Sequence, residues 1–108
     1  MSEGLQINIA KDFSEYPIGR DETDSPDTNG TKFRQELLVP ALKQALELDC
    51  NLEVSFEGVE SFGSSFLEEA FGGLIRKDGL TLADIKNHLK ITYEWDGYAR
   101  FVRRAWMH

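Results

Sequence analysis

The feature that most constrains the fold of this chain is a repeated switch between two hydrophobic periods. In three stretches, at residues 5–9, 52–56 and 89–93, apolar and polar side chains alternate one by one. That alternation is typical of a β-strand with one buried face. The sequence therefore predicts three strands that lie far apart along the chain.

Between and after these strands, apolar residues recur at the spacing of one helix face. This pattern covers residues 33–46 and 66–75, a capped segment follows at 81–88, and a last stripe occupies 98–106. Alternation of strands and helices in so short a chain predicts an α/β domain. We expect a small mixed β-sheet of three or four strands with about four helices packed on it.

Three local features modify this plan. Residues 13–18 predict a further short strand that Pro17 ends or bends. Residues 20–30 are rich in acidic and turn-forming side chains and predict a flexible loop. Pro40 lies inside the first helical stretch, where it lacks a backbone donor and its ring clashes with the preceding turn. We therefore expect a kink or a break there, with the helix restarting around Pro40 in its first turn.

The composition indicates one globular domain and disfavours several kinds of partner. At 108 residues, 41% of them hydrophobic, the chain fits a single domain over 1–108. Its net charge of −7 repels phosphate backbones and anionic lipid surfaces, so we expect no nucleic acid and no membrane as partner. Cys50 is the only cysteine, and no signal-peptide pattern is visible, which together predict a cytoplasmic protein.

Two serines, Ser64 and Ser65, precede the second amphipathic stretch and form the first candidate site. A serine at a helix N-terminus lies beside unpaired backbone N–H groups and the positive end of the helix dipole. Phosphorylation would place about −1.5 to −2 charges where an anion is stabilised. Alternatively, the serines only cap the helix, with Ser65 and Glu68 spaced as a capping box, and stabilise it by about 1 kcal/mol. Both interpretations stay open at this point.

The neighbouring residues have simpler explanations. Glu68 and Glu69 fall in the first turn, where their charge complements the helix dipole, so a catalytic pair of carboxylates is not required. The glycine pair at 72–73 inside a helix predicts close packing on another element. His88 and His108 lie far apart along the chain. We expect no metal, no cofactor and no enzymatic activity.

The segment 52–76 resembles a known family. Its run SFLEEAFGG at 65–73, together with GTKFRQELLVPAL at 30–42, is similar to the bacterial STAS-like domains of unknown function. These domains are related to the STAS domains of anti-sigma-factor antagonists. The resemblance implies helices on a small sheet and a regulatory, non-catalytic role. In the antagonists, a serine at this helix start is phosphorylated by a partner kinase of the histidine-kinase ATPase superfamily, and Ser64 occupies the matching position.

These residues lead to a regulatory hypothesis. We expect a protein–protein interaction module that acts with a partner of the ATPase or kinase type. Ser64 and Ser65 are the candidate phosphoacceptors or contacts. The other expected members of the interaction surface are Gly63, Phe66, Glu68, Glu69 and Arg20.

Two other classes of function stay open. A small-ligand-binding or enzymatic domain requires a pocket between the 20–30 loop and the helix start at Ser64. A structural module would self-associate as a homodimer, and Glu53 and Ser55 would suit a partly open face of the sheet. A ligand found by native mass spectrometry would favour the first class, and light scattering decides the oligomeric state.

Overall fold

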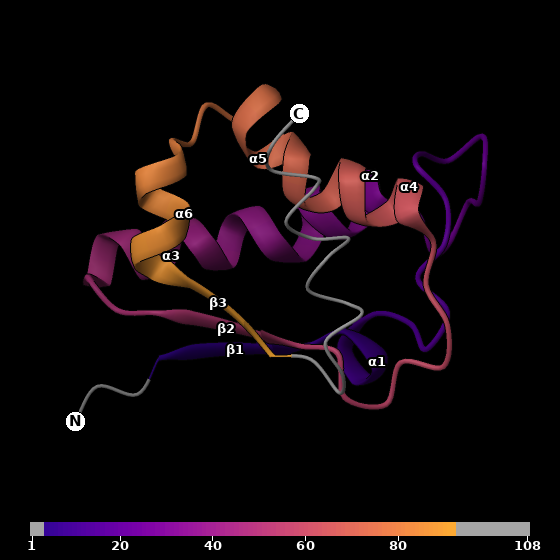
Figure 1. Ribbon diagram of the computed structural model, residues 1–108, viewed down its shortest axis with the longest axis horizontal. Helices are drawn as coiled ribbons and strands as arrows, with labels where there is room; N and C mark the ends of the chain where they lie inside the picture. The colour runs from indigo at the N-terminus through magenta and orange to yellow at the C-terminus, as the bar shows by residue number, and fades with distance from the viewer. Residues whose placement is uncertain (1–3, 93–108) are drawn as a thin grey trace.

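A parallel three-stranded sheet forms the centre of the fold. The structure is a computed structural model that describes residues 4–92, and Figure 1 shows its arrangement. The strands are β1 (Leu5–Asn8), β2 (Leu52–Ser55) and β3 (Leu89–Thr92), in the spatial order β1-β2-β3. Both pairs are parallel, and the first residues of the three strands lie in register.

Four helices accompany the sheet in the part of the chain that the structure describes. The first is α1 (Ile9–Asp12), and the last is α6 (Leu82–His88). Between them lie two longer helices, each interrupted by one π-helical turn. Residues 30–48 comprise α2 (Gly30–Phe33), a π turn (Arg34–Leu38) and α3 (Val39–Leu48), and residues 64–76 comprise α4 (Ser64–Leu67), a π turn (Glu68–Gly72) and α5 (Gly73–Arg76).

The α/β class, with three strands and four helices, is confirmed over the described residues. The expected mixed sheet is parallel there, because a helical segment follows each of the first two strands and returns the chain to the same end of the sheet. Periodicity alone marks a strand but carries no information about its direction. The parallel arrangement brings the carboxyl ends of all three strands to one edge.

The two longer helices and α6 lie on one side of the sheet, and α1 lies at the ends of the strands, as Figure 1 shows. On the central strand β2, Leu52 and Val54 are fully buried, whereas Glu53 and Ser55 are half-buried and point to the opposite, polar face. The hydrophobic core therefore lies between the sheet and the two longer helices. Its largest fully buried side chains include Phe33, Phe56, Phe66, Phe71, Ile9, Leu38, Leu42, Leu67, Leu74 and Ile85.

A cluster of phenylalanines joins α2 to the helix that begins at Ser64. The ring of Phe33 lies 5.3 Å from Phe13, 5.6 Å from Phe66 and 6.4 Å from Phe71, measured between ring centroids. Aromatic pairs at such distances contribute about 0.5–1.5 kcal/mol beyond the burial of their area. The cluster therefore fixes the start of the second long helix against α2.

The predicted strand over residues 13–18 is wrong. The side chain of Phe13 packs on the core instead, and the backbone that follows pairs with a loop rather than with the sheet. The carbonyl of Glu15 accepts a hydrogen bond from the amide of Glu60 at 2.8 Å, and the carbonyl of Pro17 accepts one from Gly63 at 3.1 Å. The segment bends at residues 15 and 16, and its partner is an irregular loop, so no strand forms.

The helix is disturbed before Pro40, as predicted, although it does not break. Residues 34–38 form a π turn in which the amide of Val39 donates to the carbonyl of Arg34, five residues back. Pro40 then lies in the first turn of α3, where it was expected to restart the helix. The wider turn gives room to the proline ring and removes the need for its missing donor.

Two further predictions fall outside the described residues: the helix over 98–106 and the last residue of the third strand, Tyr93. Among residues 4–92, no helix combines the length and the apolar character needed to cross a membrane.

Candidate functional site

The helix that carries the paired serines begins at Ser64. Gly63 is its N-cap residue, with φ −107° and ψ 143°, and no side chain caps this end. Ser64 and Ser65 are therefore the first two helical residues, and the predicted capping box is wrong. Ser64 is exposed and Ser65 is half-buried. The hydroxyl of Ser64 thus lies at the protein surface on the first helical residue.

The helix start is anchored to the irregular segment after α1. The amide of Glu60 donates to the carbonyl of residue 15, and the amide of Gly63 donates to that of residue 17. Gly63 also lies against Ile18, because a Cβ at residue 63 would be 3.7 Å from the Cα of Ile18. The side chains of Tyr16 and Ile18 stay exposed, at 53% and 44%. We call the set Tyr16, Ile18, Ser61, Gly63 and Ser64 the loop surface.

The residues predicted for the interaction surface differ in their exposure to solvent. Phe66 is fully buried among the phenylalanines, and Glu69 is 2% exposed, so neither can contribute a side chain to a surface contact. The structure therefore places both side chains in the interior, because the helix turns these positions towards α2. The side chains of Glu68 and Arg20 are 37% and 42% exposed and remain accessible.

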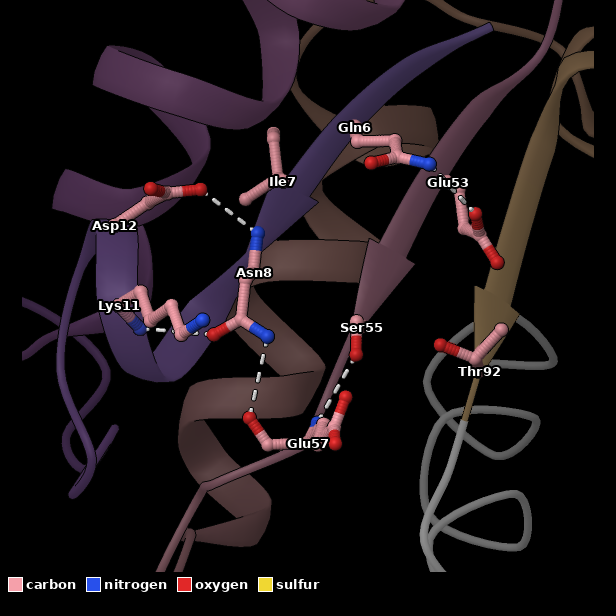
Figure 2. A pocket seen from close by; sticks show the side chains of 9 residues that line it. All are labelled: Gln6, Ile7, Asn8, Lys11, Asp12, Glu53, Ser55, Glu57 and Thr92. Carbon is pink, nitrogen blue, oxygen red and sulfur yellow. Dashed lines mark hydrogen bonds between the residues drawn. The ribbon is translucent and has the colours of Figure 1, made fainter.

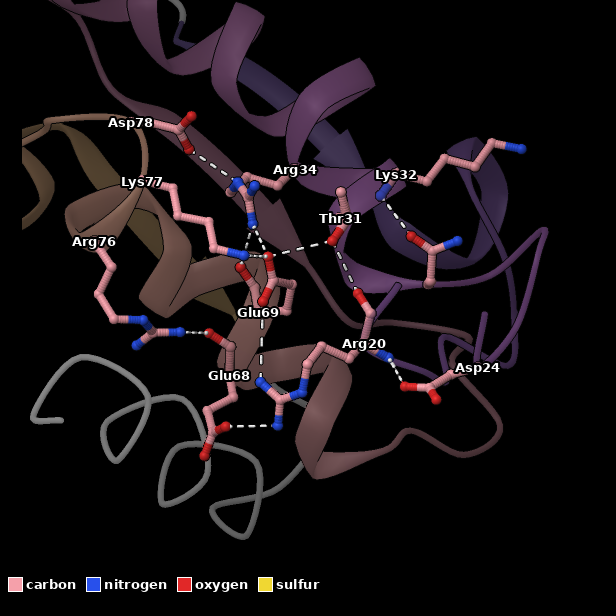
Figure 3. A network of polar contacts seen from close by, with 11 residues as sticks. Arg20, Asp24, Thr31, Lys32, Arg34, Glu68, Glu69, Arg76, Lys77 and Asp78 are labelled. Carbon is pink, nitrogen blue, oxygen red and sulfur yellow. Dashed lines mark hydrogen bonds and ion pairs between the residues drawn. The ribbon is translucent and has the colours of Figure 1, made fainter. Parts of the chain in front are cut away.

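A buried ion pair connects the π turns of the two long helices (Figure 3). The guanidinium of Arg34 lies 2.6 Å from the carboxylate of Glu69 and donates a second hydrogen bond, at 2.8 Å, to the carbonyl of the same residue. Lys77 also donates to this carboxylate at 2.8 Å, and Thr31 donates at 3.2 Å. The Nε atom of Arg34 lies 2.9 Å from Asp78 without hydrogen-bond geometry.

Gly73 makes room for this ion pair. A Cβ at residue 73 would collide with the guanidinium of Arg34, so no larger residue fits unless Arg34 moves. Gly30 plays a similar part at the start of α2, where a Cβ would lie 2.6 Å from the backbone oxygen of Phe66. The predicted close packing of the helix at 72–73 is thus confirmed for Gly73.

The ion pair changes the titration of Glu69. Burial alone would raise the pKa of this carboxyl, but the hydrogen bonds from Lys77 and Arg34 and their positive charges outweigh it. The net effect lowers the pKa of Glu69 from 4.5 to about 2. The folded protein therefore keeps Glu69 charged under conditions in which the unfolded chain protonates it.

Replacement of Glu69 by glutamine is expected to remove a pH-dependent part of the stability. Because the pKa in the folded protein lies below the unfolded value, the stabilisation is complete above about pH 5 and declines as the pH falls towards 2. A shift of this size corresponds to on the order of 3 kcal/mol. Urea unfolding of both proteins at several pH values measures it. Parallel pH profiles for wild type and Glu69→Gln would contradict the assignment.

Arg20 ties the acidic loop to the same helix. Its guanidinium donates to Glu68 at 2.9 Å and lies 3.9 Å from Glu69, and the hydrogen bond to Glu68 raises the pKa of Arg20. The ends of the loop are also closed by backbone bonds from Gly30 to Gly19 at 2.9 Å and from Thr31 to Arg20 at 3.0 Å. The loop over 20–30 therefore begins and ends beside the helix start.

One hollow of about 460 Å³ lies at the carboxyl edge of the sheet (Figure 2). Its polar groups largely satisfy one another: Asn8 accepts from the amide of Lys11 at 2.9 Å and donates to the carbonyl of Glu57 at 3.2 Å. These bonds cap α1 and hold the chain after β2. The hollow is lined by Gln6, Ile7, Asn8, Lys11, Asp12, Glu53, Ser55, Glu57 and Thr92.

A second hollow, of about 580 Å³, lies between the acidic loop and the first turns of helix 30–48. Ser64 does not line this hollow, so it differs from the pocket that the sequence predicts between the loop and Ser64. The side chain of Asn29 is buried here and already bonded, to the amide of Lys32 at 2.7 Å and the carbonyl of Ser25 at 2.8 Å. Within the described part of the chain, no group of three His, Cys, Asp or Glu side chains could hold a metal ion.

The fold and the site together define a small α/β domain, in which the central strand leads through a loop into a helix that opens on paired serines. The chain belongs to a family described as STAS-like domain of unknown function (DUF4325), whose model matches residues 29–94. The search of curated proteins and the search of solved structures found no match.

Sequence reasoning missed three residues of this region. Arg34 lies four residues before Leu38 on the apolar face of its helix, and a charged residue at such a position was a usable signal for a buried ion pair. Tyr16 and Ile18 carried no such signal, because the predicted strand over 13–18 would have buried one of its faces.

Proposed function

We propose that the chain is a non-enzymatic regulatory module that binds a protein partner through the loop surface. The observation that carries this proposal is the exposed Ser64 on the first helical residue. It follows Gly63, which contacts the segment that carries the exposed side chains of Tyr16 and Ile18. The serine is not needed as the N-cap, because Gly63 holds that position. Its hydroxyl is therefore available to a partner.

The resemblance to anti-sigma-factor antagonists supports a partner from the histidine-kinase ATPase superfamily and Ser64 as its phosphoacceptor. Glu68 lies one helical turn after Ser64, and its carboxylate is paired with Arg20. A phosphate on Ser64 would add about −1.5 to −2 charges to this surface and compete with Glu68 for Arg20. Phosphorylation would then change the charge of the loop surface while the core stays folded.

The test is to mix the purified chain with an ATPase of this superfamily encoded beside its gene. Complex formation is measured by calorimetry, and phosphate transfer from ATP by the mass of the intact chain. We expect binding, and phosphorylation that Ser64→Ala abolishes and Ser55→Ala, a control on the polar face of the sheet outside the loop surface, leaves unchanged. If the Ser64→Ala, Ser65→Ala double variant binds and functions like wild type, the site assignment is wrong.

The structure of the helix start predicts that Ser64→Ala has little effect on stability. Because the hydroxyl does not cap the helix, the free energy of unfolding should change by less than about 0.5 kcal/mol. Thr81 is the matched control: it caps α6 in a complete capping box with Asp84. Thr81→Ala should cost about 1 kcal/mol. Equal losses in the two variants, measured by urea unfolding, would restore the capping interpretation of Ser64.

Homodimerisation stays an alternative proposal. Glu53 and Ser55 lie on the polar face of a parallel sheet, and such sheets are commonly covered on both faces. Light scattering of the purified chain tests it, and a mass of one chain would reject it.

A further inference from the structure

We propose that Tyr16 and Ile18 form the apolar centre of a docking surface with an acidic rim, and that its partner presents an apolar pocket surrounded by lysine and arginine side chains. This inference rests on the proposed function and names the chemistry of the partner surface. It follows from three properties of the loop surface: exposure, rigidity and charge.

Exposure singles out this segment. Among the described residues, four large hydrophobic side chains are exposed, and Tyr16 and Ile18 are two of them. The other two, Leu48 and Leu82, lie at the last residue of α3 and the first residue of α6. Only residues 16 and 18 form a pair within one short segment, and an aromatic side chain next to an aliphatic one is a common anchor at protein interfaces.

The segment is held firmly on both sides of the two side chains. The amide of Tyr16 donates to the hydroxyl of Ser14 at 2.9 Å, and the carbonyls of residues 15 and 17 accept from the loop before α4. Pro17 is buried, and Gly19 is buried with φ +99°, a conformation that favours glycine. Two exposed side chains on a fixed backbone lose little conformational entropy when a partner binds.

The charge around these side chains is mainly negative. Across residues 14–24 and 60–68, six residues are acidic and only Arg20 is basic, and Arg20 is already paired with Glu68. The acidic residues are Glu15, Asp21, Glu22, Asp24, Glu60 and Glu68. A partner surface of opposite sign is attracted, whereas a second copy of this face, an anionic membrane or a nucleic acid is repelled.

The experiment is site-specific photocrosslinking of the full chain in its own cells. A photoreactive phenylalanine analogue replaces Tyr16 or Ile18, and Leu48 or Leu82 in the matched controls. We expect one protein to crosslink from 16 and 18 but not from 48 and 82. That protein is then purified and its affinity for the wild-type chain, Tyr16→Ser and Ile18→Ser is measured at low and at physiological salt.

The expected result is a loss of affinity of about 30-fold or more in Tyr16→Ser or Ile18→Ser, with Leu48→Ser and Leu82→Ser close to wild type. Binding should weaken as salt rises, and Glu15→Lys with Glu60→Lys should weaken it further. Crosslinks that favour 48 or 82, no crosslink at 16 and 18, or salt-independent binding would overturn the inference. A basic partner that is not an ATPase would support it and reject only the partner class of the proposed function.

Discussion

Replacement of Arg34 by alanine is expected to lower the free energy of unfolding by about 3–5 kcal/mol, as is typical when one member of a buried ion pair is removed. The variant leaves Glu69, which is 2% exposed, with Lys77 as its closest cation, a hydrogen bond from Thr31, and Arg20 at 3.9 Å. The side chain of Lys77 is 55% exposed, and solvent screens its charge. Lys77 therefore cannot replace the guanidinium. A cavity at Gly73 adds to the loss, because Arg34 fills that space in the wild type.

A double variant separates the ion pair from simple packing. Arg34→Met with Glu69→Leu removes both buried charges and keeps most of the volume, and it should be more stable than Arg34→Ala by several kcal/mol. Urea unfolding followed by circular dichroism measures all variants. If Arg34→Ala costs less than about 1 kcal/mol, the ion pair does not hold the two helices together.

Replacement of Gly30 by alanine is expected to cost about 2–3 kcal/mol, in the range of overpacked cores. The new Cβ would lie 2.6 Å from the carbonyl oxygen of Phe66 and 3.2 Å from the amide nitrogen of Ala70. Both atoms belong to the backbone of the neighbouring helix, so no side-chain rotation relieves the collision. The start of α2 and the helix that begins at Ser64 must move apart.

Gly63→Ala is the matched control for this variant. A Cβ at residue 63 would meet its nearest neighbour at 3.7 Å, an ordinary contact distance, and the backbone there has a negative φ. The expected cost is less than about 1 kcal/mol. Thermal unfolding compares the two variants. A larger loss for Gly63→Ala than for Gly30→Ala would show that the interface between the two helices is looser than the structure describes.

These interactions explain how the loop surface is presented. The phenylalanine cluster and the ion pair fix helix 64–76 against helix 30–48, and backbone hydrogen bonds join the segment 15–17 to the loop at 60–63. A binding surface on loops is best preorganised when a packed scaffold supports it. Variants of Arg34 or Gly30 should therefore weaken partner binding indirectly, together with stability.

Much of the fold follows from hydrophobic periods, and the reason is physical. Val54 and its alternating neighbours can bury one face only in an extended conformation, and the apolar stripe that includes Leu42 can do so only as a helix. Pro40 disturbs its helix wherever the helix lies in the fold. Such local effects do not depend on the rest of the molecule, so the sequence alone reveals them.

The site depended on contacts between distant segments, which periodicity does not encode. Glu69 pairs with Arg34, 35 residues away. This contact buries Glu69, although an acidic side chain is expected at the surface from sequence alone. Ser64 is the first helical residue because Gly63, held by Pro17, takes the N-cap position. Tyr16 and Ile18 are exposed because their segment pairs with a loop instead of the sheet.

Hydrogen exchange of the chain, free and bound to its protein partner, tests the central claim most directly. If the partner binds the loop surface, amides in residues 14–20 and 60–67 should exchange more slowly in the complex, while those of α3 and α6 keep their rates. Protection confined to α3, α6 or the polar face of the sheet would contradict the account, because the partner would then bind away from Ser64, Tyr16 and Ile18.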